Sequence, residues 1–311
     1  MGANTFDKSK LPSRHVTVGP SRAPHRSYLY AMGLTEEQIN RPLVGVVSAW
    51  NEAAPCNIAL MRQAQSAKKG VDAGGGTPRE FCTITVTDGI AMGHQGMKSS
   101  LVSRDVIADS IELTMRGHCY DALVGVAGCD KSLPGVMMAM LRLTVASVFM
   151  YGGSIMPGRY KGRDVTVVDV FEGVGMHSAG KMSDEELHDL ECVACPGAGA
   201  CGGQFTANTM ACVSEAIGLA LPGSAGAPAP DTSRDHYAVE SGKAVMRLLA
   251  DIAQSSDHAV LAVTHDPRTM PFADRIVLIE DGLIVGEKRQ HEVSGDIIHP
   301  LPLGKKRKAN V

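Results

Sequence analysis

Residues 122–135, ALVGVAGCDKSLPG, decide the fold. The stretch opens with an apolar run that predicts a strand buried on both faces. A short polar turn follows, and an apolar helical pattern begins at Ser132. A buried strand that leads through a turn into a helix is the repeating unit of a parallel α/β sheet. Because ligands of such sheets bind beyond the carboxyl ends of the strands, we expect a site around Cys129, Asp130 and Lys131.

The same alternation extends in both directions along the chain. Further strands are predicted at 42–50, 81–86 and 164–171, and further helices at 57–69, 98–116 and 205–221. The most apolar run, 133–150, is interrupted by Arg142, which favours a buried helix over a membrane span. Ser183 and Glu186 form a predicted capping box. We therefore expect an α/β fold with a mainly parallel sheet and helices on both faces.

Composition limits the possible functions. The chain has 311 residues, of which 44% are hydrophobic, and this suffices for one large domain or two ordinary ones. A net charge of −3 and an aromatic content of 4% do not indicate nucleic acid or an anionic membrane as a partner. The polar opening residues do not resemble a secretion signal. Eight cysteines without such a signal favour the cytoplasm, where thiols are free or metal-bound.

Four segments are expected along the chain. They are a flexible amino terminus at 1–13, a large α/β domain at 14–230, a short α/β carboxyl-terminal fragment at 231–290 and a basic tail at 291–311. The Gly- and Pro-rich residues 223–230 indicate a loop or linker between the large domain and the carboxyl-terminal fragment. In the carboxyl-terminal fragment we expect, in order, a helix at 239–253, a strand at 259–264 and a hairpin around Asp281-Gly282.

Three cysteines each lie in a Gly- or Pro-containing turn at a predicted element end. Cys56 lies in APCN, Cys129 in GCDKS and Cys201 in GACGG. Thiolates bind iron or zinc, whereas carboxylate oxygens bind magnesium. Cys129 and Asp130 could therefore hold two different metals side by side. The alternative is that the three are buried structural cysteines.

Four motifs give the chain from about 14 to 230 a close resemblance to the amino-terminal part of the dihydroxy-acid and sugar-acid dehydratase family. They are NEAAPCN at 51–57, TDGIAMGH at 87–94, GCDKSLPG at 128–135 and CPGAGACGG at 195–203, the last extended by TANTM at 206–210. The resemblance implies a hydro-lyase that removes water from a 2,3-dihydroxy acid to give a 2-keto acid, in valine and isoleucine synthesis. It also implies a cytoplasmic homodimer whose partner is a small dihydroxy acid, with no nucleic acid or membrane involved.

The resemblance also implies the cofactors. Cys56, Cys129 and Cys201 would bind a [2Fe-2S] cluster, with one iron position left open for a substrate hydroxyl. The neighbouring residues of the motifs would hold a Mg²⁺ ion.

The magnesium ligands implied by the resemblance are Asp88, Asp130 and Lys131. Lysine as an ammonium cannot bind a cation, and in the family this lysine is carbamylated, which makes it an oxygen ligand. Lys131 and His94 are the candidate catalytic residues, since His94 follows the Asp88 motif and would line the substrate pocket. A hydrogen bond within its own loop is the alternative for His94.

The chain departs from the family in its carboxyl-terminal part. In the family the base is a serine in a late Gly-rich motif, and a further magnesium ligand is a glutamate from the same region. Neither motif is found here. We therefore expect the chain to keep the cluster cysteines but not to turn over substrate alone.

Residues from about 239 to 287 resemble the end of an ABC-type ATPase domain. The matching stretches are AVLAVTHDPRT at 259–269 and FADRIVLIEDG at 272–282. The resemblance implies that His265 contacts the γ-phosphate. The nearest match to a phosphate-binding loop is GMHSAGKM at 175–182, where Met182 replaces the required hydroxyl. We expect a gene fusion with an inactive ATPase relic; the alternatives are a non-catalytic fusion product and an ATP-linked module.

Overall fold

The computed structural model describes residues 6–254, 275–280 and 283–289. The chain divides into two compact units, Met1–His258 and Ala259–Val311.

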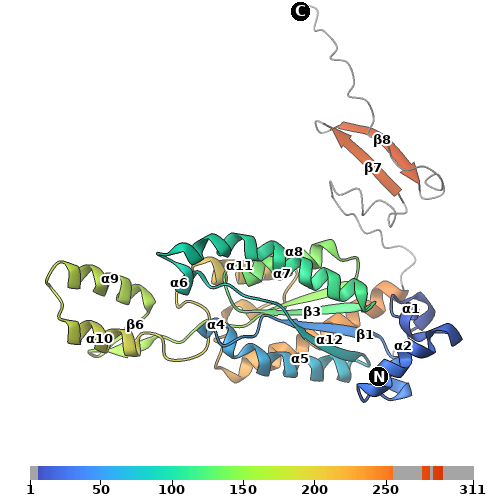
Figure 1. Ribbon diagram of the computed structural model, residues 1–311, viewed down its shortest axis with the longest axis horizontal. Helices are drawn as coiled ribbons and strands as arrows, with labels where there is room; N and C mark the ends of the chain where they lie inside the picture. The colour runs from blue at the N-terminus through green and yellow to red at the C-terminus, as the bar shows by residue number, and fades with distance from the viewer. Residues whose placement is uncertain (1–5, 255–274, 281–282, 290–311) are drawn as a thin grey trace, which may run out of the picture. The chain divides into compact units, whose positions relative to one another are not determined.

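Four parallel strands form the central sheet of the first unit, in the order β2-β1-β3-β4 (Figure 1). Their bounds are β1 Leu43–Ser48, β2 Thr77–Cys82, β3 Ala122–Ala127 and β4 Ala146–Tyr151. Strand β2 pairs with one side of β1, and strand β3 pairs with the other side. The strand order therefore reverses between β1 and β3, and ligands of such sheets bind at the carboxyl ends of these two strands.

Helices cover both faces of this sheet (Figure 1). One face carries α5 Leu60–Ala73 and α12 Thr232–Gln254, and the other carries α7 Lys98–Gly117, α8 Ser132–Arg142 and α11 Thr206–Ala216. Alternate side chains of β3 point to opposite faces of the sheet. Leu123 packs in the core with α7 and α8, whereas Val124 packs in the core with α5 and α12. Burial on both sides explains the continuous apolar strands, and the predicted α/β fold class is confirmed.

The remaining elements of the first unit are short or lie at its edges. They are η1 Lys8–Lys10, α1 Arg14–Thr17, η2 Pro20–Arg22, α2 Ala23–Ala31, α3 Glu36–Asn40, α4 Pro55–Ile58, α6 Asp88–Ala91, η3 Gln95–Met97, β5 Gly158–Tyr160, β6 Arg163–Val165, α9 Val167–Ser178, α10 Asp184–Val193 and η4 Ser224–Gly226. The hairpin β5-β6 and the pair α9 and α10 form an arm that projects beyond the carboxyl end of the sheet (Figure 1). The arm has a small core of its own around Val165 and Leu190.

Three predicted elements were wrong. The strand predicted at 81–86 lies earlier in the chain, at Thr77–Cys82, so only residues 81 and 82 belong to both. The apolar run 133–150 is not one helix, because α8 ends at Arg142, the backbone turns extended at Leu143 and β4 follows. The β-branched run 164–171 is a strand only at its first two residues, which end β6, because Thr166 and Asp169 form a capping box that starts α9. The capping box of Ser183 and Glu186 is confirmed.

The region around residue 230 packs with the first unit. Helix α12 begins at Thr232 and contacts α5 and β4. Within the predicted linker, Ala229 is buried and its amide donates to the carbonyl of Ser154 at 2.8 Å. The division of the chain at residue 230 stays a prediction about its segments.

In the second unit, β7 Arg275–Glu280 and β8 Leu283–Arg289 pair antiparallel, as the predicted hairpin requires. The predicted turn residues Asp281 and Gly282 lie outside the described residues. So do the strand predicted at 259–264 and His265.

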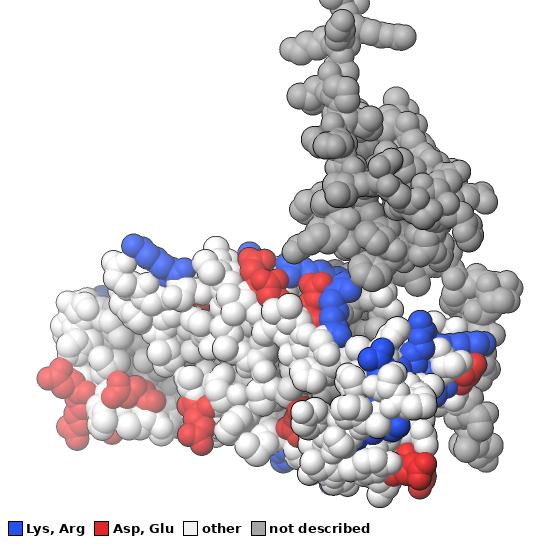
Figure 2. Space-filling model, turned by 45° about the vertical axis from the view of Figure 1, so that its right-hand side comes forward, with Lys and Arg blue, Asp and Glu red and all other residues white. Residues whose placement is uncertain are grey.

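Much of the described surface carries no charge. On the face shown in Figure 2, acidic and basic side chains are interspersed among uncharged residues. Large apolar side chains are exposed on α7, such as Leu101 and Val102, and on α9, where Phe171 is exposed and Gly173 alone is buried. No helix among residues 6–254 is both long enough and apolar enough to cross a bilayer.

Candidate metal centre

The carboxyl ends of β1 and β3 bring two of the predicted cysteines together. Cys56 lies in α4 after β1, and Cys129 lies two residues after the end of β3. Gly128 makes this approach possible, because a Cβ at that position would lie 1.9 Å from the carbonyl oxygen of Cys56. Only a glycine lets the end of β3 pass so close to the Cys56 turn.

The thiol of Cys56 affects the ionisation of Cys129. The interaction with Cys56 raises the pKa of Cys129, and burial raises it further. The Cys129 Sγ also donates to Oδ1 of Asp130 at 2.8 Å, while the Cys56 Sγ donates to Oδ1 of Asn57 at 3.1 Å. A buried thiol beside another thiol and a carboxylate is costly to ionise unless a cation compensates the charge.

Cys201 approaches this pair on a loop. The Gly199 amide donates to the carbonyl of Pro55 at 2.9 Å, and the Ala200 amide donates to that of Gly153 at 2.9 Å. Cys201 is exposed, and its pKa is raised first by desolvation and then by the charges of Cys56 and Asp130. As they stand, however, no three or more His, Cys, Asp or Glu side chains within the described ranges are arranged to hold a metal ion. The third thiol therefore lies near the pair without closing a site.

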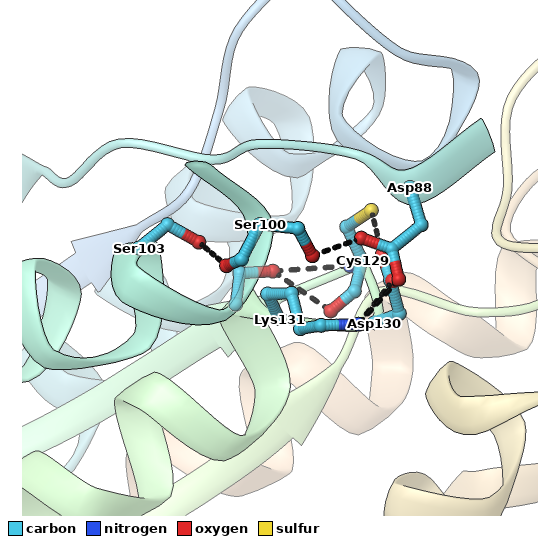
Figure 3. Close-up of polar contacts among 7 residues, drawn as sticks. Asp88, Ser100, Ser103, Cys129, Asp130 and Lys131 are labelled. Carbon is cyan, nitrogen blue, oxygen red and sulfur yellow. Dashed lines mark hydrogen bonds and ion pairs between the residues drawn. The ribbon is translucent and has the colours of Figure 1, made fainter. Parts of the chain in front are cut away.

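Beside the thiols, Lys131 lies between two carboxylates (Figure 3). Its Nζ donates to Oδ2 of Asp88, at the start of α6, and to Oδ2 of Asp130 at 3.0 Å. Burial lowers the pKa of Lys131, but the hydrogen bonds to the two aspartates outweigh it and the net pKa is raised. The ammonium thus lies between two carboxylates and forms an ion pair with each.

Asp130 contacts both the thiol of Cys129 and the ammonium of Lys131. One of its oxygens accepts from Cys129 and the other from Lys131. Burial, together with a hydrogen bond to Asp88, raises its pKa above the ordinary value. A single carboxylate therefore connects the thiol of Cys129 with the ammonium of Lys131.

Ser100 was missed by the sequence analysis. This buried residue of α7 donates its hydroxyl to Oδ1 of Asp88, and its own carbonyl accepts from Ser103 at 2.6 Å (Figure 3). Burial alone would raise the pKa of Asp88, but hydrogen bonds with Asp130, Lys131 and Ser100 lower it overall. A serine in a helical pattern gives no signal of this contact, because the contact depends on how α7 packs beside α6.

His94 is bound within its own loop. Its Nδ1 accepts from the Gly96 amide at 3.1 Å, which leaves Nε2 to donate to the carbonyl of Ile90 at 2.8 Å. The side chain is exposed, and both ring nitrogens are used locally. This is the alternative considered for His94, and its catalytic role stays a prediction.

The stretch 175–182 does not form a loop between a strand and a helix. Residues 175–178 are the end of α9, and Gly180 lies in the turn that follows, with φ of 69°. A phosphate-binding loop needs the preceding strand and the following helix.

Comparison with known proteins identifies the family. A model described as dihydroxy-acid/6-phosphogluconate dehydratase N-terminal matches residues 41–263. A dihydroxy-acid dehydratase of Parvibaculum lavamentivorans is 82% identical over 257 residues, which are 83% of this chain and 45% of that protein.

More distant relatives give the same result. Dihydroxy-acid dehydratases of Pelagibacter ubique and Natronomonas pharaonis are 78% and 55% identical over 244 and 248 residues, which are 78% and 80% of this chain and 43% and 42% of those proteins. The chain thus spans less than half the length of these relatives. It belongs to the dihydroxy-acid/6-phosphogluconate dehydratase family.

Proposed function

We propose that the first unit is the metal-binding half of a hydro-lyase of the dihydroxy-acid dehydratase type. Such an enzyme removes water from a 2,3-dihydroxy acid and gives a 2-keto acid, a step in the synthesis of valine and isoleucine. The observation that carries the proposal is that Asp130 joins the thiol pair of Cys56 and Cys129 to the group of Asp88 and Lys131. Relatives named dihydroxy-acid dehydratase at up to 82% identity support it.

The donors fit a [2Fe-2S] cluster beside a Mg²⁺ ion. Cys56, Cys129 and Cys201 would hold the cluster, because soft cations bind thiolates and would offset the raised pKa values of the Cys129 and Cys201 thiols. When bound, the cluster and the magnesium ion supply Lewis acidity toward the leaving hydroxyl and toward the substrate oxygens.

The oxygen group would hold the magnesium ion. Asp88 and Asp130 offer carboxylate oxygens, which match the preference of this ion. Lys131 fits only after modification, since its ammonium now fills the space between the carboxylates. In carbamylation, which the resemblance to the family implies, the Lys131 ammonium would lose a proton and the resulting amine would add CO₂ with loss of a second proton. This would replace the positive charge with an anionic pair of oxygens.

The residues of this chain would bind and orient the substrate. The side of the site with Asp88 and Lys131 would take the substrate carboxylate and the C2 hydroxyl, and the three cysteines would lie on the side of the C3 hydroxyl. The family resemblance implies that a serine of a late Gly-rich motif removes the proton at C2, and that motif is not found in these 311 residues. We therefore propose that the 311 residues bind metal but do not turn over substrate alone.

A reconstitution experiment tests this proposal. The chain is purified without oxygen, loaded with iron, sulfide and Mg²⁺, and assayed with dihydroxyisovalerate and with gluconate for keto-acid formation. We expect about two irons per chain and no turnover. Addition of the uncovered half of the P. lavamentivorans relative as a separate polypeptide should give turnover of dihydroxyisovalerate. Robust turnover by the chain alone would contradict the proposal that the chain binds metal without turning over substrate. Persistent absence of iron would contradict the metal site.

The resemblance to the family also implies an oligomeric state and a cellular location for the protein. We propose a cytoplasmic homodimer, which the exposed apolar side chains of α7 and α9 support, because such surfaces are usually covered by a partner. Sedimentation of the loaded protein tests this, with a dimer expected and a strict monomer contradicting it.

The carboxyl-terminal segment is proposed to be an ABC-type ATPase relic without activity. The antiparallel pair β7 and β8 and the separate second unit are consistent with a different origin for this segment. The ATP-linked alternative gains no support within the described residues, since 175–178 lie in α9. Equilibrium dialysis with ATP should show no binding, and stoichiometric binding would favour the alternative.

A further inference from the structure

The loop that carries Cys201 needs a fixed position if its thiol is to join the other two. Cys56 and Cys129 follow strands of the buried sheet, whereas Cys201 is exposed and lies in a glycine-rich loop. On one side this loop borders a cavity of about 360 Å³, which is lined by Ile155, Gly203 and Asn208, among others. Because space lies beside the loop, packing alone does not fix it.

Asn208, near the start of α11, makes hydrogen bonds to two backbone carbonyl groups of the loop that carries Cys201. Its Nδ2 donates to the carbonyl oxygen of Cys201 at 2.8 Å and to that of Gly203 at 2.5 Å. Carbonyl oxygens only accept, so the amide nitrogen must face them. The Oδ1 of Asn208 then faces the other way and requires a donor.

That donor is Tyr151. Its hydroxyl contacts Oδ1 of Asn208 and, since this oxygen only accepts, the hydroxyl must donate. Tyr151 is the last residue of β4 and is completely buried. The position of Asn208 is thereby tied to the end of a core strand, at the same edge of the sheet as Cys129.

A buried arginine fixes Tyr151 in turn. Arg234, itself completely buried, donates to the carbonyl of Tyr151 at 2.8 Å, and its guanidinium lies 5.5 Å from the centre of the tyrosine ring. Burial raises the pKa of Tyr151; Arg234 opposes this, and the charges of Cys201, Cys56 and Cys129 add to it. The hydroxyl therefore lies within electrostatic range of all three thiols and stays protonated to donate to Asn208.

We propose that Asn208, oriented by the Tyr151 hydroxyl, is a positioning residue that holds Cys201 in place for the cluster. The inference rests on the proposed function, in which the three cysteines bind one cluster. Asn208 touches neither metal nor substrate in this account. It acts by fixing two carbonyl groups of the Cys201 loop, so that less ordering of the loop is needed when the third thiol binds.

Two measurements on the full chain test the positioning role. The first is amide hydrogen exchange across 201–204 in the metal-free protein, which reports the loop without any cofactor. The second is the rate at which a chelator removes iron from the reconstituted protein, followed by visible absorbance. We expect Asn208→Ala to speed both about 10-fold. Tyr151→Phe, which keeps the ring against Arg234, should speed both roughly five-fold, as the loss of one hydrogen bond predicts.

Matched variants separate positioning from a general loss of packing. Thr77→Val removes a buried hydroxyl that donates to the carbonyl of Gln38 at 2.7 Å, at the start of β2 and therefore at the opposite end of the sheet. Tyr160→Phe removes a hydroxyl that donates to the carbonyl of Glu186 at 3.2 Å, in the arm. Both should leave exchange at 201–204 and iron release within about two-fold of the unsubstituted chain.

The outcomes distinguish this inference from the proposed function. Asn208→Asp keeps the oxygen that accepts from Tyr151 and removes the two donors, so it should behave like Asn208→Ala and serves if the alanine variant does not fold. Unchanged exchange and iron release in both variants would overturn the inference while leaving the cluster intact. If the unsubstituted chain takes up no iron, the proposed function fails, and the exchange measurement alone decides whether Asn208 holds the loop.

Discussion

The two sides of the candidate cluster site are built differently. At the carboxyl ends of β1 and β3, Cys56 and Cys129 are fixed by a buried parallel sheet and by the close approach of Gly128. On the other side, Cys201 is exposed on a loop that a few hydrogen bonds attach to its surroundings. The comparison indicates one pair of thiols fixed by the sheet and a third thiol whose position depends on the hydrogen bonds of its loop. It also explains why the structure brings the three cysteines near each other without a closed set of ligands.

The largest expected effect comes from breaking the rigid side. In Gly128→Ala the new Cβ would lie 1.9 Å from a backbone oxygen of Cys56, so the end of β3 must move away. We expect a loss of about 3 kcal/mol or more in the free energy of unfolding, measured by urea denaturation of the metal-free chain. Gly175→Ala in α9 is the control, since a Cβ there meets nothing within 4 Å. Equal stability of the two variants would show that the close approach does not matter.

The two sides should also differ in thiol reactivity. In the metal-free chain, we expect iodoacetamide to label the exposed Cys201 at least about 10-fold faster than Cys129, which is 3% exposed. Exposed Cys192 in the arm provides the reference rate. Peptide mass spectrometry over time measures all three. Similar rates for Cys129 and Cys201 would mean that the sheet end is as open as the loop.

The smallest expected effect is on the pH dependence of stability, at the opposite end of the sheet. No metal site is proposed there, so this end provides a comparison with the cysteine-bearing end. Lys8 donates to the carbonyl of Arg41 at 2.6 Å, and its Nζ lies 4.0 Å from Asp121, just before β3. Burial lowers the pKa of Lys8 to about 8, with Asp121 opposing. Between pH 8 and the unfolded value of about 10.4, the unfolded chain binds more protons, so stability rises with pH.

The expected slope for Lys8 is about 1 kcal/mol per pH unit in that window. Lys8→Met should lack this rise, and the difference between the two proteins removes the contribution of the thiols, which titrate in both. Denaturation at pH 8, 9 and 10 measures it. Parallel curves would mean that Lys8 is as solvated in the folded chain as in the unfolded one.

How far the sequence predicted this site depends on how local each signal is. The strand of β3 and the turn with Cys129, Asp130 and Lys131 are contiguous, and their place at the sheet edge follows from the α/β pattern alone. The α/β pattern allows Lys131 and Asp88 to meet but does not require it, and their grouping was implied by the family resemblance; the structure shows the ion pair between them. The order of the strands, and hence which ends meet, is not readable from apolar runs.

The positioning group was invisible for a specific reason. The apolar run 133–150 contains both most of α8 and most of β4, and it predicts one helix, so Tyr151 had no place at a strand end. Asn208 lay within the recognised motif at 206–210 but without a role. Its contacts join β4 to the Cys201 loop, and contacts between segments 57 residues apart leave no periodic trace.

The measurement that tests the central claim most directly is the iron and sulfide content of the anaerobically reconstituted chain and of its Cys→Ser variants. If three thiols converge at the ends of β1 and β3, the chain binds about two irons and two sulfides. Cys56→Ser, Cys129→Ser and Cys201→Ser should each lose most of this iron, while Cys212→Ser, on α11, should keep it. A colourless, iron-free chain, or equal iron in all four variants, would contradict the account.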